Sequence, residues 1–214
     1  MSNLVTVLDY GVGNILSVAR GFEAVGASVN VTTTVEGIEN AQRLILPGVG
    51  AFAAGMTELK KNHLDSAIIK LAHSGVPLLG ICLGMQFLMD SSEEFGETAG
   101  LGLIPGKVLP IPPNSHDGDS LIVPHIGWSG LELSGDKKNW DNSILVNTPV
   151  HSDVYFVHSF FSQPNNQDHQ LAHCVYGGNS LSAVICKENV MGCQFHPEKS
   201  GLIGLNILRT FLSI

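Results

Sequence analysis

The first half of the chain alternates short apolar runs with longer segments in which apolar residues recur every three or four positions. The short runs predict strands at Leu4–Leu8, Ser28–Thr33, Arg43–Leu46 and Val76–Cys82. The helical spacing predicts helices over Ile15–Val25, over Met56–Ala72 with a break around Asn62–Asp65, and from Leu83 to Met89. Strands that alternate with helices of this length indicate βαβ units, and therefore a mostly parallel sheet with helices on both faces.

The pattern changes near Gly100, after which no long helical segment occurs before Phe195. Short runs separated by turn residues predict antiparallel strands added to the parallel sheet in the C-terminal half. These strands are expected at Lys107–Ile111, Ser143–Val146, Val154–Val157, Ala172–Tyr176, Leu181–Cys186 and Met191–Phe195. A closing helix is expected over Ile203–Leu212, and the polar, proline-rich segment Pro112–Asp119 is expected to be an exposed loop. We therefore predict an α/β fold that forms a single domain over residues 1–214.

Composition and charge narrow the class of protein. The 214 residues are enough for one well-filled domain, and 44% apolar with 14% charged residues suits a globular protein with a large core. A formal charge of −8 argues against a nucleic-acid partner. The N-terminus lacks a signal-peptide pattern and no apolar stretch is long enough to cross a bilayer, so no membrane association is expected. Four cysteines without a C-x-x-C pair predict free thiols in a reducing cytoplasm.

A candidate nucleophile lies between a predicted strand and a predicted helix. Cys82 has a glycine two residues before it and another two residues after it, in Gly80–Gly84 (GICLG). This spacing permits the sharp strand-to-helix turn of a nucleophile elbow, with sulfur in place of a serine oxygen. A thiolate there would be stabilised by the helix N-terminus, and the Leu83 N–H would face an oxyanion formed on the substrate. A buried structural cysteine explains the pentapeptide equally well, so this motif alone leaves both interpretations open.

A candidate base and its orienting carboxylate follow the last predicted strand. His196 is separated from Glu198 only by the rigid Pro197. Amide hydrolysis by a cysteine needs a group that accepts a proton and later protonates the departing ammonia, and a histidine oriented by a carboxylate can do both. An exposed histidine beside a solvated glutamate is the alternative, which the pairing with an elbow cysteine disfavours.

The nine histidines raise the question of a metal site. They form no H-E-x-x-H motif and no Cys/His cluster with recognisable spacing, so neither a metal nor another cofactor is expected. His125 and His158 are interpreted as structural or substrate-lining residues.

Several segments, taken together, resemble a known family. Gly80–Gln86 (GICLGMQ) and Gly192–Glu198 (GCQFHPE) are similar to the two signatures of the class I, or triad, glutamine amidotransferases. The match narrows to the glutaminase subunits of imidazole glycerol phosphate synthases, and it covers the chain from about Leu4 to the C-terminus. The segments that narrow it are Leu8–Val18 (LDYGVGNILSV), Pro47–Phe52 (PGVGAF), Pro124–Trp128 (PHIGW), Tyr155–Phe160 (YFVHSF) and His196–Gly201 (HPEKSG).

The resemblance implies a flavodoxin-like sheet and hydrolysis of L-glutamine through a glutamyl thioester. It also implies a heterodimer with a (β/α)8-barrel cyclase that consumes the ammonia in histidine biosynthesis. Cys82, His196 and Glu198 match the catalytic triad. The positions implied for other roles are Leu83, Val49 and Gly50 for the oxyanion, Gln86, Glu94, Ser159 and Phe160 for glutamine, and Asn14, Trp128 and Lys199 for the partner interface.

The loop Pro47–Gly50 suits regulation, because glycines on both sides of Val49 make it easy to turn one peptide group. An ordinary turn after a strand is the alternative interpretation. We expect that the loop completes the oxyanion hole only when a loaded partner is bound.

Two positions depart from the family pattern, which usually has Asn where this chain has Ser129 and often has Tyr where it has Phe160. The departures leave open a paralogous glutaminase that supplies another synthase, such as a sugar-amidinating enzyme of surface polysaccharide biosynthesis. Two further alternatives are an inactive relative that serves as a binding module, which the intact triad disfavours, and another cysteine hydrolase, which the two signatures disfavour.

Overall fold

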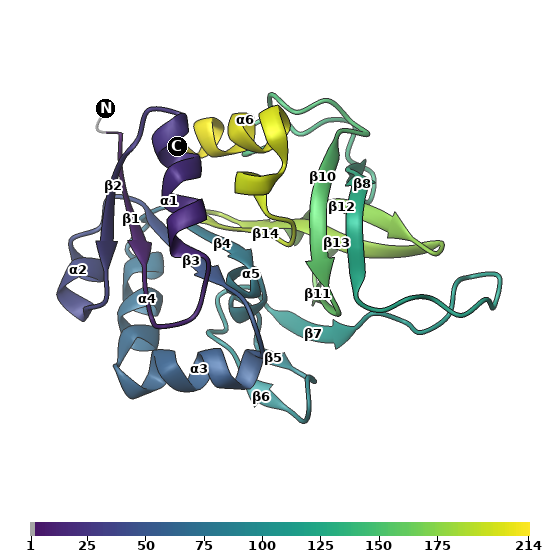
Figure 1. The fold of residues 1–214 in the computed structure, drawn as a ribbon, viewed down its shortest axis with the longest axis horizontal. Helices are drawn as coiled ribbons and strands as arrows, with labels where there is room; N and C mark the ends of the chain where they lie inside the picture. Colours follow the sequence, from purple (N-terminus) through teal and green to yellow (C-terminus); the bar gives the residue numbers. More distant parts are fainter. Residues whose placement is uncertain (1–2) are drawn as a thin grey trace.

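The computed structural model describes residues 3–214 and is built around one large twisted sheet (Figure 1). Its eight strands run in the order β2-β1-β3-β4-β14-β13-β12-β9. The strands are β1 (Leu4–Leu8), β2 (Ser28–Thr32), β3 (Leu44–Gly48), β4 (Leu78–Cys82), β9 (Glu132–Leu133), β12 (Gln170–Tyr176), β13 (Asn179–Lys187) and β14 (Val190–Cys193). The first five strands in this order are parallel, and the last three are antiparallel. The parallel part has the 2-1-3-4-5 order of flavodoxin-like folds, which confirms the predicted fold class.

Helices cover both faces of the parallel part, as the alternating pattern predicted. They are α1 (Ile15–Ala24), α2 (Val35–Glu39), α3 (Phe52–Lys61), α4 (Leu64–His73), α5 (Leu83–Phe87) and α6 (Gly201–Leu212), with short 3-10 helices η1 (Gln167–His169) and η2 (Pro197–Lys199). Helices α1 and α6 pack on one face, and α2, α3, α4 and α5 pack on the other. The predicted break near Asn62 is confirmed, because His63 has φ +56° and separates α3 from α4.

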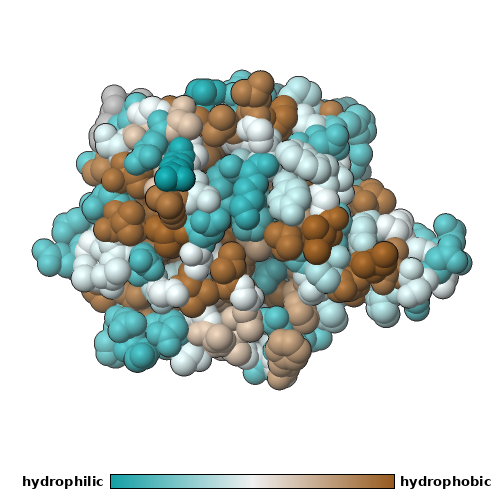
Figure 2. All heavy atoms as spheres, in the orientation of Figure 1, coloured by the Kyte–Doolittle hydropathy of each residue, from teal (hydrophilic) through white to brown (hydrophobic). Residues whose placement is uncertain are grey.

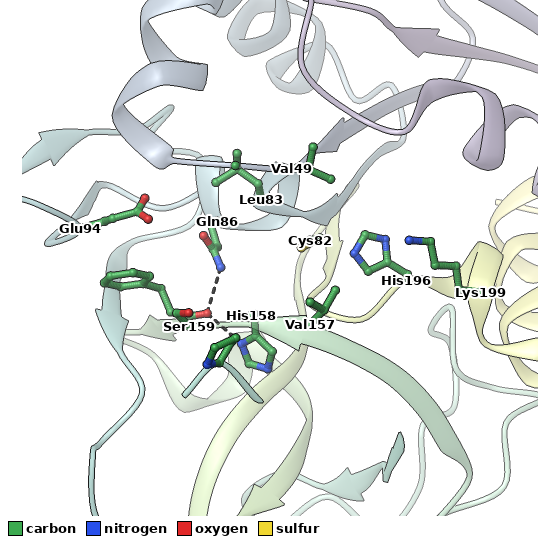
Figure 3. Close-up of a pocket in the computed structure, with 13 residues that line it drawn as sticks. Val49, Cys82, Leu83, Gln86, Glu94, Val157, His158, Ser159, His196 and Lys199 are labelled. Carbon is green, nitrogen blue, oxygen red and sulfur yellow. Dashed lines mark hydrogen bonds between the residues drawn. The ribbon is translucent and has the colours of Figure 1, made fainter. Parts of the chain in front are cut away.

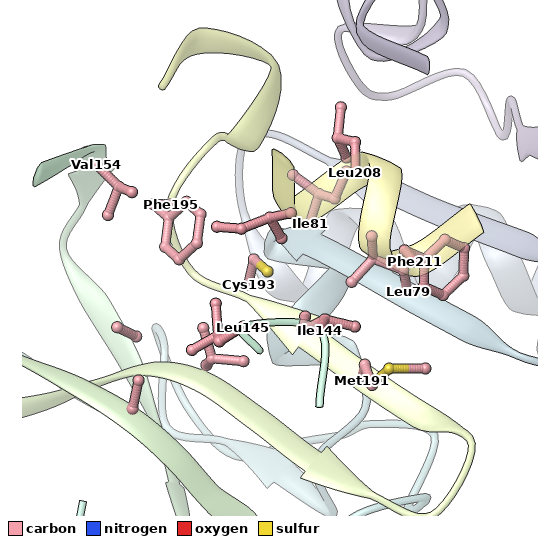
Figure 4. Packing of buried hydrophobic residues seen from close by; sticks show 14 of the residues in the cluster. Leu79, Ile81, Ile144, Leu145, Val154, Met191, Cys193, Phe195, Leu208 and Phe211 are labelled. Atoms are coloured by element: carbon pink, nitrogen blue, oxygen red, sulfur yellow. The ribbon is translucent and has the colours of Figure 1, made fainter. Parts of the chain in front are cut away.

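Each face of the sheet has its own hydrophobic core because side chains alternate along a strand. In β3, Ile45 belongs to the core under α1 and α6, whereas Leu44 and Leu46 belong to the other core. In Figure 4, the core under α6 joins Leu79 of β4 to Met191 of β14 and Phe211 of α6. Strands buried on both faces therefore appear in the sequence as nearly continuous apolar runs.

The C-terminal half adds two smaller sheets beside the main one. One pairs β8 (His125–Gly130) with β10 (Asp153–His158), and the other has the order β11-β7-β5-β6. The strands of the second sheet are β5 (Ser91–Ser92), β6 (Thr98–Ala99), β7 (Gly106–Pro110) and β11 (Phe160–Pro164). The expectation of added antiparallel strands is confirmed for β10, β12 and β13. It is wrong for Met191–Phe195, because β14 lies beside β4 and runs parallel to it, as the last strand of the parallel part. Strands β5, β6, β8, β9 and β11 were not predicted.

One predicted strand is wrong. Ser143–Val146 forms turns, in which the Ser143 hydroxyl donates to the carbonyl of Trp140 at 2.6 Å and accepts from the Leu145 N–H at 3.1 Å. Ile144 and Leu145 are apolar because they enter the core beside β14 (Figure 4). Two adjacent buried residues can occur in a turn as well as in a strand, so this short apolar run could not distinguish a strand from a turn. Helix α3 also begins at Phe52, four residues before the expected start.

The segment Pro112–Asp119 is mostly exposed and projects from the body after β7, as expected (Figure 1). An isolated bridge between Asn114 and Ser120 closes it into a narrow loop.

Candidate active site

The candidate nucleophile stands at the carboxyl end of β4, on the edge of the sheet where flavodoxin-like folds bind ligands. Cys82 has φ +56° and ψ −113°, a conformation that side chains rarely adopt, and α5 begins at the next residue. The two neighbouring glycines are required by close packing. A Cβ on Gly80 would lie 2.5 Å from the Gly84 carbonyl oxygen, and one on Gly84 would overlap the carbonyl oxygen of Leu46. The predicted elbow is therefore present in full.

The candidate base reaches Cys82 from the end of β14. His196 is held by its backbone, because its N–H donates to the Tyr155 carbonyl at 3.1 Å and its carbonyl accepts from the Ser200 hydroxyl at 2.7 Å. Its Nδ1 donates to Glu198 Oε1 at 2.9 Å, which leaves Nε2 for the thiol. Both side chains are buried. The structure thus brings the three predicted triad residues together.

The protonation of His196 follows from its neighbours. Burial lowers the pKa of His196, but hydrogen bonds to Cys82 and Glu198 and the negative charge on both groups outweigh it and raise the pKa to about 9. At neutral pH the imidazole therefore carries a proton that it can give to a leaving group.

A cavity of about 360 Å³ opens above Cys82 and is large enough for a small amino acid (Figure 3). The predicted site residues that line it are Cys82, His196, Leu83, Val49, Gly50, Gln86, Glu94, Ser159, Phe160 and Lys199. Glu198 lies behind His196, outside the lining. Sequence positions as distant as 49, 82 and 196 meet here because β3, β4 and β14 are neighbours in the sheet.

The loop after β3 forms one wall of the cavity. Gly48 pairs with Cys82 across the sheet, and the exposed Val49 and Gly50 follow it directly. Gly50 has φ +94°, a backbone conformation that favours glycine. At the far end of the loop, Glu94 accepts a hydrogen bond from the Phe52 N–H and so holds the start of α3.

The opposite wall is the corner where β10 ends and β11 begins. Gln86 donates from its side-chain nitrogen to the Phe160 carbonyl at 3.0 Å (Figure 3) and to Gln194 Oε1 at 3.0 Å. Gln194 in turn points its amide nitrogen at the Cys82 sulfur, at 3.8 Å. The amide nitrogen of Gln86 is therefore bonded within the protein, and Gln86 and Gln194 together link the Phe160 corner to Cys82.

The three predicted interface residues occupy different places. Lys199 lies at the rim of the cavity. Trp128 is 56% exposed on β8, with its ring edge-on to Tyr155 at 5.9 Å. Asn14 caps α1, because its side-chain oxygen accepts from the Ser17 N–H at 3.3 Å. Hydrophobic side chains gather in patches across the middle of the face shown in Figure 2.

Three residues of the site were not singled out by sequence reasoning for their contacts. Tyr10 donates its hydroxyl to the Pro47 carbonyl, Gln194 contacts Cys82, and Ser200 holds His196. All three lie inside the segments that resemble the family, which was the available signal. Among residues 3–214 there is no group of three acidic, His or Cys side chains suited to a metal ion. Over the same residues, no helix combines the length and apolar character that crossing a bilayer requires.

Comparison with known proteins gives concordant results. A family model described as glutamine amidotransferase class-I matches residues 6–213. The chain is 51% identical over 210 residues to imidazole glycerol phosphate synthase subunit HisH 1 of Legionella pneumophila, covering 98% of this chain and 99% of that protein. It is 47% identical over 211 residues to subunit HisH of Methanosarcina barkeri, covering 98% of each. For subunit HisH of Geobacillus thermodenitrificans the identity is 41% over 211 residues, covering 99% of this chain and 96% of that protein.

Solved structures show the same fold at low identity. A crystal structure of a glutamine amidotransferase matches with a TM-score of 0.72 and 18% identity, over 98% of this chain and 97% of that one. PurLQS from Thermotoga maritima matches with a TM-score of 0.71 and 18% identity, over 100% and 99%.

Proposed function

Because the chain belongs to the class-I glutamine amidotransferases and, within them, to the HisH subunits of imidazole glycerol phosphate synthase, we propose that Cys82, His196 and Glu198 are its catalytic triad. The chain is the glutamine-hydrolysing subunit of that synthase and serves histidine biosynthesis. The observation that carries the proposal for the triad is the buried His196–Glu198 pair directed at a cysteine with φ +56°.

The reaction starts from a Cys82 thiolate beside a protonated His196, and the thiolate sulfur attacks the side-chain carbonyl carbon of L-glutamine. The carbonyl electrons move onto oxygen, and the tetrahedral intermediate collapses as His196 protonates the amide nitrogen, so that ammonia leaves and a thioester remains. His196 then takes a proton from water, which attacks the thioester carbon. Glutamate departs, and Cys82 and the protonated His196 are restored. Glu198 holds His196 with Nε2 toward the sulfur throughout.

Two N–H groups are assigned to the oxyanion. The Leu83 N–H lies at the start of α5, where no side chain caps the helix. The second comes from the peptide between Val49 and Gly50, in the loop that lines the cavity opposite Phe160. Losing one such donor costs roughly 10²–10³ in rate, so turning this single peptide is enough to switch the enzyme between slow and fast states.

Glutamine is assigned to the cavity with its backbone groups between Glu94, Gln86 and the Ser159–Phe160 corner. The carboxylate of Glu94 supplies the negative charge that an α-ammonium group needs. The ammonia acceptor is a (β/α)8-barrel cyclase subunit that forms a heterodimer with contacts to Asn14, Trp128 and Lys199. The exposed Trp128 supplies the aromatic anchor typical of such an interface.

The whole of residues 1–214 acts as one glutaminase domain in this proposal, which the match over residues 6–213 supports. A cytoplasmic location is part of the proposal as well, since all four cysteines are free and a reducing compartment keeps them so.

The test measures glutamate and ammonia formation from glutamine by the purified chain alone, with a cyclase subunit, and with the cyclase loaded with its own ligand. We expect little activity alone and strong stimulation by the loaded cyclase. Failure of every cyclase to stimulate glutaminase activity, or an active Cys82→Ser variant, would overturn the proposal.

A further inference from the structure

A chain of hydrogen bonds runs from the edge strand β8 to the substrate corner at Phe160. The Ser129 hydroxyl lies 3.0 Å from His125 Nε2, and His125 Nδ1 lies 3.2 Å from His158 Nε2. His158 Nδ1 then lies 2.9 Å from the Phe160 carbonyl oxygen (Figure 3). His125 and His158 are directly opposite each other in the pairing of β8 with β10.

The direction of each hydrogen bond in this chain follows from the end at the Phe160 carbonyl. A carbonyl oxygen can only accept, so His158 carries its proton on Nδ1. In a neutral His158 the other nitrogen must accept, which makes His125 Nδ1 the donor. His125 Nε2 is then an acceptor, and the hydroxyl of Ser129 donates to it. One neutral arrangement therefore satisfies all three bonds, and both imidazoles are of the Nδ1–H form.

The surroundings keep both rings neutral and in place. His125 is 2% exposed and His158 is 6% exposed. The His125 ring is stacked between Phe156, at 5.1 Å, and Tyr176, at 4.2 Å between centroids. Burial lowers the pKa of His125, and burial lowers the pKa of His158 to about 4, despite its bond to Phe160.

The hydrogen-bonded chain ends at the Phe160 carbonyl, beside the cavity above Cys82. The Phe160 carbonyl accepts from both His158 and Gln86, so it is held from two sides. Ser159 and Phe160 line the cavity, and they directly follow His158 in the sequence. A change in His158 orientation therefore moves the backbone that faces the substrate.

We propose that Ser129, His125 and His158 form a one-directional hydrogen-bond relay that positions the Ser159–Phe160 backbone for glutamine. This inference rests on the proposed function for the identity of the ligand. The three residues are positioning residues, since they act through Phe160. Ser129 provides the hydroxyl that completes the chain, and it directly follows the exposed Trp128 in β8.

The first test reads the tautomers in the whole chain labelled with ¹⁵N-histidine. At neutral pH, His125 and His158 should each show a protonated Nδ1 and an unprotonated Nε2 in long-range ¹H–¹⁵N spectra. An Nε2–H form or a charged ring at either residue overturns the relay. This spectrum does not depend on enzymatic activity.

The second test measures glutamine binding by calorimetry in the Cys82→Ser background, where hydrolysis cannot interfere. Adding Ser129→Ala, which removes the terminal donor, should weaken binding of glutamine roughly three- to tenfold, as expected for one lost hydrogen bond. Ser129→Thr and Ser129→Asn each keep a donor and should restore most of the affinity. Unchanged affinity in Ser129→Ala, or equal losses in all three variants, overturns the proposal.

The two proposals fail separately. If the native chain with its cyclase releases no ammonia while the Ser129 series alters glutamine affinity as expected, the proposed function fails and the relay stands. If ammonia is released normally and the Ser129 series leaves both affinity and tautomers unchanged, only the relay fails.

Discussion

Tyr10 donates its phenolic hydroxyl to the carbonyl oxygen of Pro47 at 2.9 Å, directly before the loop that carries Val49 and Gly50. The ring is buried, and burial together with the charge of nearby Cys82 raises the pKa of Tyr10 well above its usual range, so it remains a donor. This bond anchors one end of the loop, while Glu94 holds the other end at Phe52. The rearrangement proposed for this loop is thereby confined to the peptides between Pro47 and Phe52.

Tyr10→Phe should therefore loosen the loop and lower stability together. Removal of a buried hydrogen bond costs about 1 kcal/mol, which corresponds to a fall in Tm of about 2–4 °C in a chain of this size. We expect the cyclase-stimulated kcat to fall several-fold as well. Thermal unfolding and steady-state kinetics check both effects. Ser143→Ala, which removes a hydroxyl bonded to Trp140 outside the cavity and leaves the Pro47 bond intact, is the control, and an equal loss of kcat in the two variants would contradict the anchor.

Cys82→Ser should abolish glutaminase activity and leave the fold intact, because an alcohol is far less ionised than a thiol. Activity of the purified complex should drop below about 1% of the native value, while the thermal unfolding curve is retained. Cys186→Ser is the matched control, since Cys186 is half-buried and lies outside the cavity. Retention of more than a few per cent of activity would argue against Cys82 as the nucleophile.

His196→Asn should be almost as damaging, because no other group is assigned to move the proton. Glu198→Gln should be milder in kcat, since its amide oxygen still accepts from His196 Nδ1. Orienting carboxylates can nevertheless contribute several orders of magnitude, so a large loss remains compatible with orientation. Equal kcat values for Glu198→Gln and Cys82→Ser would show a larger role for the carboxylate.

The pH profile of the stimulated glutaminase should fall on the alkaline side as His196 loses its proton. The pKa of His196 is raised from 6.5 to about 9, so the general acid is present at neutral pH and disappears as the pH rises through about 9. The same shift stabilises the folded state below pH 6.5, and this contribution is lost as the pH rises through about 9. Glu198→Gln removes a charge that supports protonation and should move the alkaline limb to lower pH. An unchanged limb in that variant would contradict the assignment.

Gly50→Pro should suppress the cyclase-stimulated rate far more than it weakens complex formation. The substitution removes the Gly50 N–H and cannot adopt φ +94°. The expected loss is roughly 10²–10³ in stimulated kcat, as for one oxyanion donor. Gly50→Ala strains the same backbone position but keeps the N–H, so it separates strain from loss of the donor. Equal stimulated rates for the native protein and Gly50→Pro would exclude this peptide from the oxyanion hole.

Much of the architecture was predictable because it depends on local patterns. The buried strands Leu4–Leu8 and Leu78–Cys82 are apolar along their whole length, and the helices after them have clear spacing. Gly80 is required by a contact within the turn, with the Gly84 carbonyl, so its spacing from Cys82 indicated an elbow, whereas the need for glycine at 84 comes from Leu46 on the neighbouring strand. The strands, the helices and the need for Gly80 are determined by neighbours in the sequence.

Features that depend on distant contacts were predicted less well. Strand β8 contains Gly127, Trp128 and Ser129 and lacks a clean alternation, because its environment is set by β10 and by Tyr176. Ser143–Val146 was assigned to a strand because burial alone made it apolar. In both cases the partner that decides the structure lies far away in the chain.

The order of residues was sufficient to predict the parallel sheet, a candidate elbow at Cys82 and the candidates for base and orienting carboxylate. The bonds from Gln86 to Phe160, from Tyr10 to Pro47 and between His125 and His158 became visible only in the folded chain. Hydrogen bonds depend on distances and directions within a few tenths of an ångström, and such placement arises when the strands assemble. A pattern of residue types contains the groups that can bond, whereas the packed sheet selects the pairs that do.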